Sequence, residues 1–316
     1  MSSPTSPQPA SGRLPHLGVL RFSGRDAQAF LQGQISNDAR RLAEGSGLLA
    51  AYSSAQGRVL AVLHLLPLQD AIAAILPREL IQPTIESLRR YVLRAKVSME
   101  DAGESLWVHG AHDGTALRPA GLAPTPPARH AQTDGIVVGA VDAFTQRFWV
   151  IGSAESLARH GLAAGENARV ERDWRLADIR AGLPQVYAAT REAFVAQMLN
   201  LDLVGGISFN KGCYTGQEII ARAQHLGRIK RRLHRLQFPA GGWEVGQTVC
   251  LADGRSGRLT EVAANEHGCE ALAVLPVQAS AASGDDQEGA AATVVDAQEL
   301  ALPYAIPPLE ARAVQG

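Results

Sequence analysis

The chain has 316 residues, of which 46% are hydrophobic and 19% are charged, so it can bury a substantial core in two or three lobes. Its formal net charge of −1 gives no overall attraction to nucleic acid or to an anionic membrane. Cys213, Cys250 and Cys269 form an odd and sparse set, which excludes a disulfide framework and favours a reducing, cytoplasmic compartment. No apolar run reaches the roughly 18 residues that span a bilayer.

The first part of the chain has the pattern of a strand followed by a helix. Residues 1–13 have neither the basic start nor the apolar centre of a secretory signal, and we expect a disordered tail there. Residues 14–22 alternate like a strand, and Ser23-Gly-Arg-Asp26 resembles a capping box that opens a helix through about Ile35. Apolar runs and helical periodicity then predict three strands and a helix, in the order 48–52, 58–66, 71–76 and 79–91.

The middle of the chain divides at a loop. Residues 118–134 begin with four prolines in twelve positions and lack periodicity, so we predict a loop there between two lobes. Strand patterns precede and follow this loop, at 93–99, 105–110, 135–140 and 147–151. Two helical segments that end at glycine come next, at 153–160 and 170–181.

The C-terminal region predicts a small antiparallel β-barrel or sandwich. Short apolar segments separated by turns occupy 233–238, 248–251, 256–262 and 269–274. Residues 279–292 are too polar and too poor in large apolar side chains to pack, and we expect a mobile loop. Residues 293–295 and 300–304 would supply the last strand.

The segment from Lys211 to Glu218 is the strongest candidate for a reactive site in the sequence. Thr215 and Glu218 have the spacing of a capping box, which would place Cys213 two residues before a helix N-cap. The positive end of that helix and the ammonium of Lys211 would favour a thiolate at Cys213. The alternative is that Cys213 is a small buried hydrophobic residue.

The octapeptide Lys211-Gly-Cys-Tyr-Thr-Gly-Gln-Glu218 resembles the signature of the YgfZ-type folate-binding proteins, which are relatives of the T protein of the glycine cleavage system. Further segments that resemble this family cover roughly residues 14 to 235, at 17–34, 36–38, 56–58, 91–97 and 173–184. The resemblance implies an α+β, multi-lobed, aminomethyltransferase-like fold that binds tetrahydrofolate in a central pocket. It divides the chain into a two-lobed folate-binding body at 14–235 and a C-terminal β-barrel at 236–316.

The resemblance also implies which residues contact folate. We expect the side chains of Gln34, Asn37, Asp38, Gln197 and Asn200 to read the amino and lactam edges of the pteridine. The alternative for these residues is that they cap a helix and the following turn. Ala196 stands where the family has proline, which puts the rigidity of that loop in question.

Further candidate folate-binding and reactive residues are charged side chains or belong to the octapeptide. Arg94, and similarly Arg58, could hold the glutamate tail of folate through a bidentate guanidinium. The abundance of arginine in this chain favours the alternative that each is a solvated surface charge. Tyr214, Gln217 and Glu218 are placed at the folate by the resemblance. Cys213 and Lys211 are the candidate reactive pair.

Residues 222–235 carry six cationic side chains and no acid. Such a run could bind phosphates, but it lacks stacking aromatic residues. We therefore expect the end of a helix and an edge strand there, and no dedicated nucleic-acid site.

Two departures from the transferase relatives decide the predicted function. Residues 75–84 contain no aspartate where those relatives have a catalytic one, and Arg180 stands in place of a glutamate. No spacing of Cys or His predicts a metal site. The sequence thus predicts a tetrahydrofolate-binding protein that supports assembly or repair of iron–sulfur proteins, with those proteins or their assembly factors as partners. The alternatives are a folate-dependent aminomethyl transferase that uses another acid, such as Asp38 or Glu218, and a nucleic-acid-binding module that uses residues 222–235.

Overall fold

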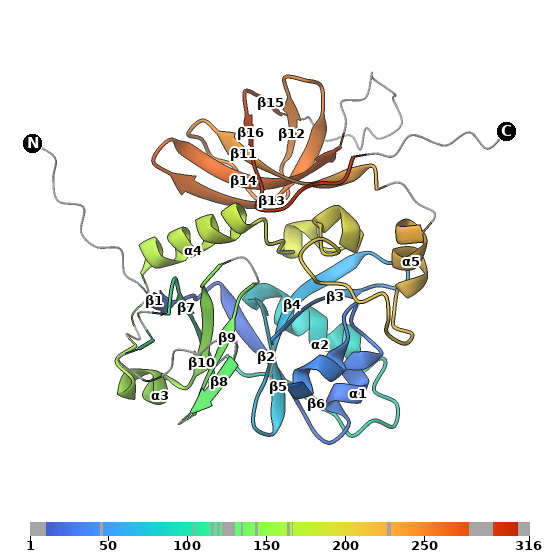
Figure 1. Cartoon of the computed structure of the whole chain (residues 1–316), viewed down its shortest axis with the longest axis vertical. Helices are drawn as coiled ribbons and strands as arrows, with labels where there is room; N and C mark the ends of the chain where they lie inside the picture. Colours follow the sequence, from blue (N-terminus) through green and yellow to red (C-terminus); the bar gives the residue numbers. More distant parts are fainter. Residues whose placement is uncertain are drawn as a thin grey trace, which may run out of the picture.

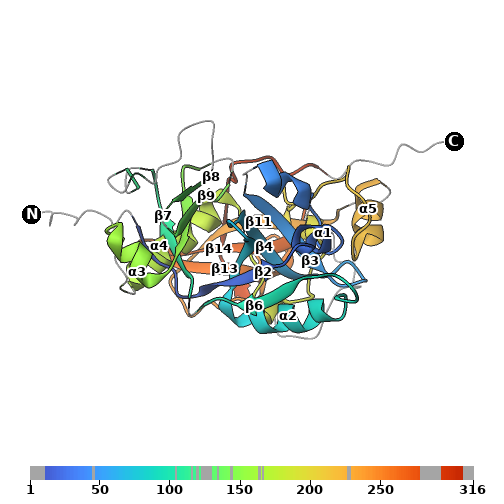
Figure 2. The same ribbon diagram turned by 90° about the horizontal axis from the view of Figure 1, so that it is seen from below.

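A computed structural model describes residues 11–308 except 45–46, 104, 115–116, 119–120, 122–129, 134, 143–144, 163–164, 166, 226–228 and 278–292. Three β-sheets form two layers (Figure 1). The first two sheets lie side by side in one layer, as Figure 2 shows from below, and the third sheet forms the other layer. The helix α4 (Ala168–Ala181) lies between the layers. None of the helices in the described ranges has the length and apolar composition to cross a bilayer.

The first sheet is antiparallel, with its strands in the order β3 (Leu48–Ser53), β4 (Val59–Pro67), β5 (Ala71–Pro77), β2 (Leu17–Ser23) and β6 (Ser98–Asp101). β4 and β5 are buried along nearly their whole length, which explains why they read as continuous apolar runs. α1 (Ala27–Gln32) and α2 (Ile81–Arg89) contribute Phe30 and Ile85 to the core of this sheet. The strands predicted at 48–52, 58–66 and 71–76 are confirmed. The strand predicted at 93–99 begins later, at Ser98.

The second sheet is also antiparallel, in the order β1 (Ser11–Arg13), β7 (Trp107–Ala111), β10 (Phe148–Gly152), β9 (Ile136–Ala140) and β8 (His130–Thr133). α3 (Ala154–Arg159) packs on it through Leu157. Two predictions are corrected here. Residues 11–13 of the predicted tail form β1, which pairs with β7, while residues 1–10 lie outside the described residues. The predicted loop 118–134 contains β8. Both strands lie at sheet edges, are short, and have little apolar sequence to reveal them.

The third sheet has the order β15 (Thr293–Val295), β12 (Thr248–Leu251), β13 (Ser256–Asn265), β14 (Gly268–Pro276), β11 (Arg231–Phe238) and β16 (Gln298–Leu300). All of its pairs are antiparallel except β12 with β15. Leu236 and Phe238 belong to a core within this sheet, while Leu233 and Leu272 pack on the body. The predicted boundary at 235/236 therefore falls inside β11. The loop predicted at 279–292 lies outside the described residues.

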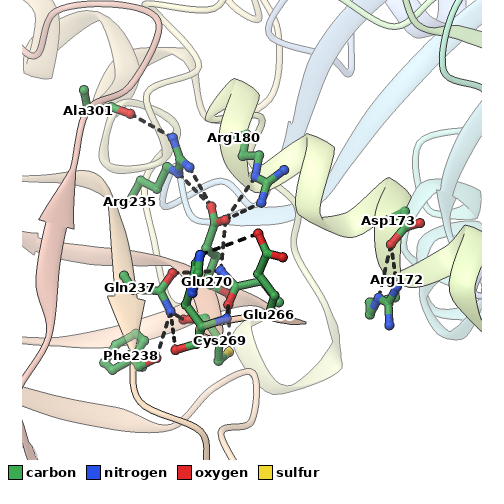
Figure 3. A network of polar contacts seen from close by, with 12 residues as sticks. Arg172, Asp173, Arg180, Arg235, Gln237, Phe238, Glu266, Cys269, Glu270 and Ala301 are labelled. Atoms are coloured by element: carbon green, nitrogen blue, oxygen red, sulfur yellow. Dashed lines mark hydrogen bonds and ion pairs between the residues drawn. The ribbon is translucent and has the colours of Figure 1, made fainter. Parts of the chain in front are cut away.

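Helix α4 connects the two layers. Trp174 fills the space over Gly110 of β7 so closely that a Cβ atom there would lie 2.3 Å from its ring. On the opposite side, Arg180 of α4 and Arg235 of β11 both point at the carboxylate of Glu270 in β14 (Figure 3). Arg180, which replaces the transferase glutamate, is thus an anchor for the third sheet.

The two predicted capping boxes are absent. The N-cap of α1 is Asp26, which makes no side-chain cap hydrogen bond and instead accepts from the backbone N–H of Lys96. α5 (Gln217–His225) begins after Thr215, whose hydroxyl donates to Gln34 and whose N–H donates to Gly33. Tertiary contacts therefore replace local capping at both helices. Four 3-10 helices occur in the described ranges: η1 (Ala39–Glu44), η2 (Arg78–Leu80), η3 (Ala188–Thr190) and η4 (Ala196–Leu199).

Candidate functional site: a central cavity and the cysteine loop

A cavity of about 280 Å³ lies where the first and second sheets meet, which we call the central cavity. Its walls come from η1, from β3 and β4, from β9 and β10, and from the segments that follow α4 and η4. The described lining residues are Arg41, Gly47, Leu48, Leu49, His64, Leu65, Leu66, Ala140, Val141, Asp142, Trp149, Leu183, Val204 and Gly205. The volume is near the lower limit for pockets that hold small organic ligands, and most of the lining is apolar.

A few polar groups stand out in this apolar lining. His64 and Trp149 contact each other edge to face, with ring centroids 5.2 Å apart. Burial, and secondarily the nearby charge of Arg147, lowers the pKa of His64 to about 4, so its imidazole is neutral at pH 7. The carboxylate of Asp142 accepts from Thr145 and pairs with Arg147, which also binds Asp178 at 2.7 Å. A neutral imidazole, an indole and a fixed carboxylate can orient a flat heterocycle.

The neutral state of His64 predicts a loss of stability in acid. Its pKa is about 4 in the folded protein and 6.5 when exposed, so between these values only the unfolded chain binds the proton. Stability therefore falls as pH drops from 6.5 toward 4, and His64 should account for about 2 kcal/mol of that loss at pH 5. Urea unfolding at pH 7.5 and pH 5 should show a correspondingly smaller loss for His64→Phe. His267→Phe, at an exposed position, should lose as much as the wild type; an equal loss in all three proteins would contradict the assignment.

Lys211 is a structural clamp. Its ammonium donates to the backbone carbonyls of Gln32, Ile35 and Asn37, at 2.7, 2.7 and 2.9 Å. It also lies 4.7 Å from the centroid of the Tyr214 ring. Burial lowers the pKa of Lys211 to about 8. All three N–H groups of the ammonium are used by these carbonyls. The sequence predicted that this ammonium lies near Cys213 and favours its thiolate; the hydrogen bonds that it makes are to backbone carbonyls.

Cys213 is exposed on the loop before α5. It precedes the first residue of that helix by four positions, farther than the capping-box prediction placed it. The other two cysteines are less accessible: Cys250 is half-buried and Cys269 is buried. Burial raises the pKa of the Cys269 thiol to about 11. Of the three thiols, Cys213 is therefore the one most open to a partner or oxidant.

The amides expected at folate are engaged in the protein. Asn37 donates to the carbonyls of Leu49 and Gly205, both in the wall of the central cavity, and it accepts from the N–H of Asp38. Asn200 exchanges hydrogen bonds with the backbone of Leu233 in β11. Neither amide lines the central cavity. Their side chains bind distant backbone segments around the cavity, which is neither the predicted contact with folate nor the local capping of the alternative.

The remaining candidates also lie outside the central cavity. Gln197 donates to the carbonyl of Ile220, and Gln34 accepts from Thr215. The Arg40 guanidinium lowers the pKa of Asp38 to about 2. The others do not lie together: Tyr214 is buried against Lys211, Arg94 is exposed, Gln217 is half-buried, and Glu218 pairs with Arg222.

The residues that do line the cavity gave weak sequence signals. The one signal of this site in the sequence is His64, because it interrupts the apolar run that forms β4. Asp142 and Trp149 come from the ends of neighbouring strands in another sheet, and no local pattern connects them to His64. Among the described residues, no group of three or more His, Cys, Asp or Glu side chains is arranged to hold a metal ion.

The basic stretch 222–235 is not a continuous charged surface where it is described. Arg232 is buried and binds Asp202 at 2.6 and 2.9 Å. Arg235 binds Glu270. Residues 226–228 lie outside the described part of the chain. These ion pairs connect segments of the protein.

Sheets enclosing a central cavity, with a curled C-terminal sheet packed over them, define an aminomethyltransferase-like fold. The structure is similar to aminomethyltransferase T of the glycine cleavage system from Bartonella henselae, with a TM-score of 0.65 and 15% sequence identity over 84% of this chain and 78% of that one. The α+β, multi-lobed fold predicted from the sequence is confirmed.

Sequence comparison gives the family. No family model matches the chain. The tRNA-modifying protein YgfZ of Escherichia coli O45:K1 (strain S88 / ExPEC) is 31% identical over 268 residues, which cover 79% of this chain and 81% of the relative. The same figures hold for YgfZ of Escherichia coli (strain K12 / DH10B). The chain belongs to the YgfZ family.

Proposed function

We propose that this protein binds tetrahydrofolate or another reduced folate in the central cavity and thereby supports the assembly or repair of iron–sulfur proteins in the cytoplasm. The main support for folate binding is the central cavity, in which the neutral imidazole of His64 contacts the indole of Trp149 and most lining residues are apolar. Membership of the YgfZ family and the aminomethyltransferase-like fold agree with this ligand class.

The lining residues fit a reduced folate. Trp149 is 2% exposed, and its indole N–H has no hydrogen-bond partner within the described residues. That donor, His64 and Asp142 can meet the donor and acceptor edges of a pteridine. The small volume takes the ring system and leaves the glutamate tail outside. Arg41, which lines the cavity and is exposed, can pair with a tail carboxylate.

The cavity favours binding over aminomethyl transfer. Transfer requires a base to accept a proton from the reacting nitrogen. Asp142 is the one acid among the described lining residues, and it is held by Arg147 and by two hydrogen bonds from Thr145. The carboxylate of Asp142 already accepts hydrogen bonds at both of its oxygens. It is better suited to orienting a bound ring.

Filling the central cavity tests the binding step. Val204→Trp places a large side chain at the cavity wall and should weaken binding of tetrahydrofolate at least tenfold in isothermal titration under reducing conditions. Val294→Trp is the matched control, because Val294 is 76% exposed on β15, and it should bind as the wild type does. Equal affinities for the two variants, or no binding by the wild type at millimolar ligand, would refute the central cavity as a folate site.

We propose Cys213 as the reactive centre for iron–sulfur support, since it is the exposed thiol of the octapeptide. Cys213→Ala should fold normally and keep its affinity for folate. In cells that lack the native protein, it should fail to restore the activity of iron–sulfur enzymes. Cys250→Ala is the matched control and should restore that activity. Full complementation by Cys213→Ala would show that this thiol carries no chemistry.

A further inference from the structure

A second cavity, of about 560 Å³, lies between the body and the third sheet, and we call it the arginine cavity. The body contributes Arg58, just before β4, and the segment between η3 and η4. The third sheet contributes the start of β11 and parts of β12, β13 and β14. The described lining residues are Arg58, Arg191, Glu192, Ala193, Phe194, Met198, Arg231, Thr248, Ser256, Gly257, Arg258 and Val274. Arg58 precedes β4, whereas His64, which lines the central cavity, lies farther along that strand.

The lining of the arginine cavity is strongly cationic. It contains four guanidinium groups and one carboxylate, that of Glu192. Arg58 donates through Nη1 to the carbonyl of Ala193, and Arg231 donates through Nη2 to the carbonyl of Ser256, each at 2.9 Å. A guanidinium has five N–H donors in a rigid fork, so these contacts fix two of the side chains and leave most of their donors for another group.

Three of the four guanidinium groups in this cavity have no acidic partner among the described residues. In the described part of the chain, Arg58, Arg191 and Arg231 make no ion pair. Nε of Arg191 is buried and has no hydrogen-bond partner there. Glu192, the next residue, has a φ of 63°, a conformation that is strained for a residue with a side chain. A charged donor without an acceptor beside a strained residue indicates that a ligand completes this arrangement.

We propose that the arginine cavity binds the phosphate groups of an anionic ligand, either a free diphosphate or triphosphate or the backbone of an RNA. Arginine forks match the oxygens of phosphate in a bidentate manner, and several forks facing one cavity favour a ligand with more than one negative charge. The site joins the body to the third sheet, so a bound phosphate would bridge the two layers. Its described lining residues include none of those of the proposed folate site, and Cys213 is not among them.

Isothermal titration of the full chain with sodium pyrophosphate, at low and at physiological salt, tests the proposal. The double variant Arg191→Gln/Arg231→Gln should weaken binding at least tenfold. Arg25→Gln/Arg89→Gln removes the same charge from exposed positions outside the cavity and should change the affinity less than threefold. Both doubles should unfold at temperatures close to the wild type and should retain tetrahydrofolate binding. If the cavity double does not fold, Arg191→Gln alone replaces it.

A parallel titration with a short single-stranded RNA identifies the source of the phosphate. RNA binding that is stronger than pyrophosphate binding, and that the cavity double but not the control double abolishes, supports the site with RNA as its ligand. The proposal is overturned if neither probe binds the wild type, if both doubles weaken binding equally, or if citrate binds as tightly as pyrophosphate does.

Discussion

Lys211→Met is expected to lower the free energy of unfolding by about 3 kcal/mol, because three backbone carbonyls lose their donor. These carbonyls belong to Gln32, Ile35 and Asn37, at the end of α1 and in the turn that follows it. The ammonium of Lys211 is the contact that fastens the octapeptide to this turn, 174 to 179 residues away in the chain. Urea unfolding at pH 7 measures the effect.

The matched control is Lys230→Met, which removes the same group from an exposed position and should change stability by less than about 0.5 kcal/mol. Comparison of the two lysine variants also tests whether Lys211 acts on the Cys213 thiol or only stabilises the fold. If Lys211→Met is as stable as the wild type but slows alkylation of Cys213, the lysine acts on the thiol through its charge. A loss of stability with unchanged alkylation would establish it as the clamp that the contacts describe.

Long elements with a clear period could be predicted from the sequence. β4 and β5 are continuous apolar runs because both faces of their sheet are covered, and such runs are visible without any tertiary information. β1 and β8 could not be found in this way. β1 is a short edge strand that pairs with the distant β7, whereas β8 pairs with the adjacent β9 but is too short and too polar to show a strand pattern.

The candidate site was only partly predictable, for a similar reason. The octapeptide is contiguous, so its residues could be singled out. Their partners are not contiguous: Thr215 donates to Gln34 instead of capping α5, and Lys211 donates to the carbonyls at the end of α1. Outside the octapeptide, Asn37 likewise donates to the distant Gly205. An amide or hydroxyl in a sequence looks the same whether it binds a ligand or a distant carbonyl. The central cavity is likewise formed by residues from two sheets that only the fold brings together.

The buried ion pair of Arg232 with Asp202 gives the second large effect. Arg232 lies in β11, and its guanidinium binds both oxygens of Asp202 as well as the carbonyl of Gln197 in η4. Its side chain is 6% exposed and that of Asp202 is 8% exposed. Arg232→Met leaves the carboxylate buried without a partner. We expect the free energy of unfolding to fall by about 3–5 kcal/mol in urea unfolding.

Two further variants decide whether this loss comes from the uncompensated charge. Asp202→Asn combined with Arg232→Met removes the stranded carboxylate and should recover a large part of the stability. Arg222→Met removes a basic residue of the same stretch from an exposed i,i+4 pair with Glu218, and it should cost less than about 0.5 kcal/mol. If Arg232→Met were as mild as Arg222→Met, the basic stretch would be a solvated surface after all. The attachment of the third sheet to the body would then depend on its other contacts, which include apolar packing, the Glu270 anchor and the hydrogen bonds between Asn200 and Leu233.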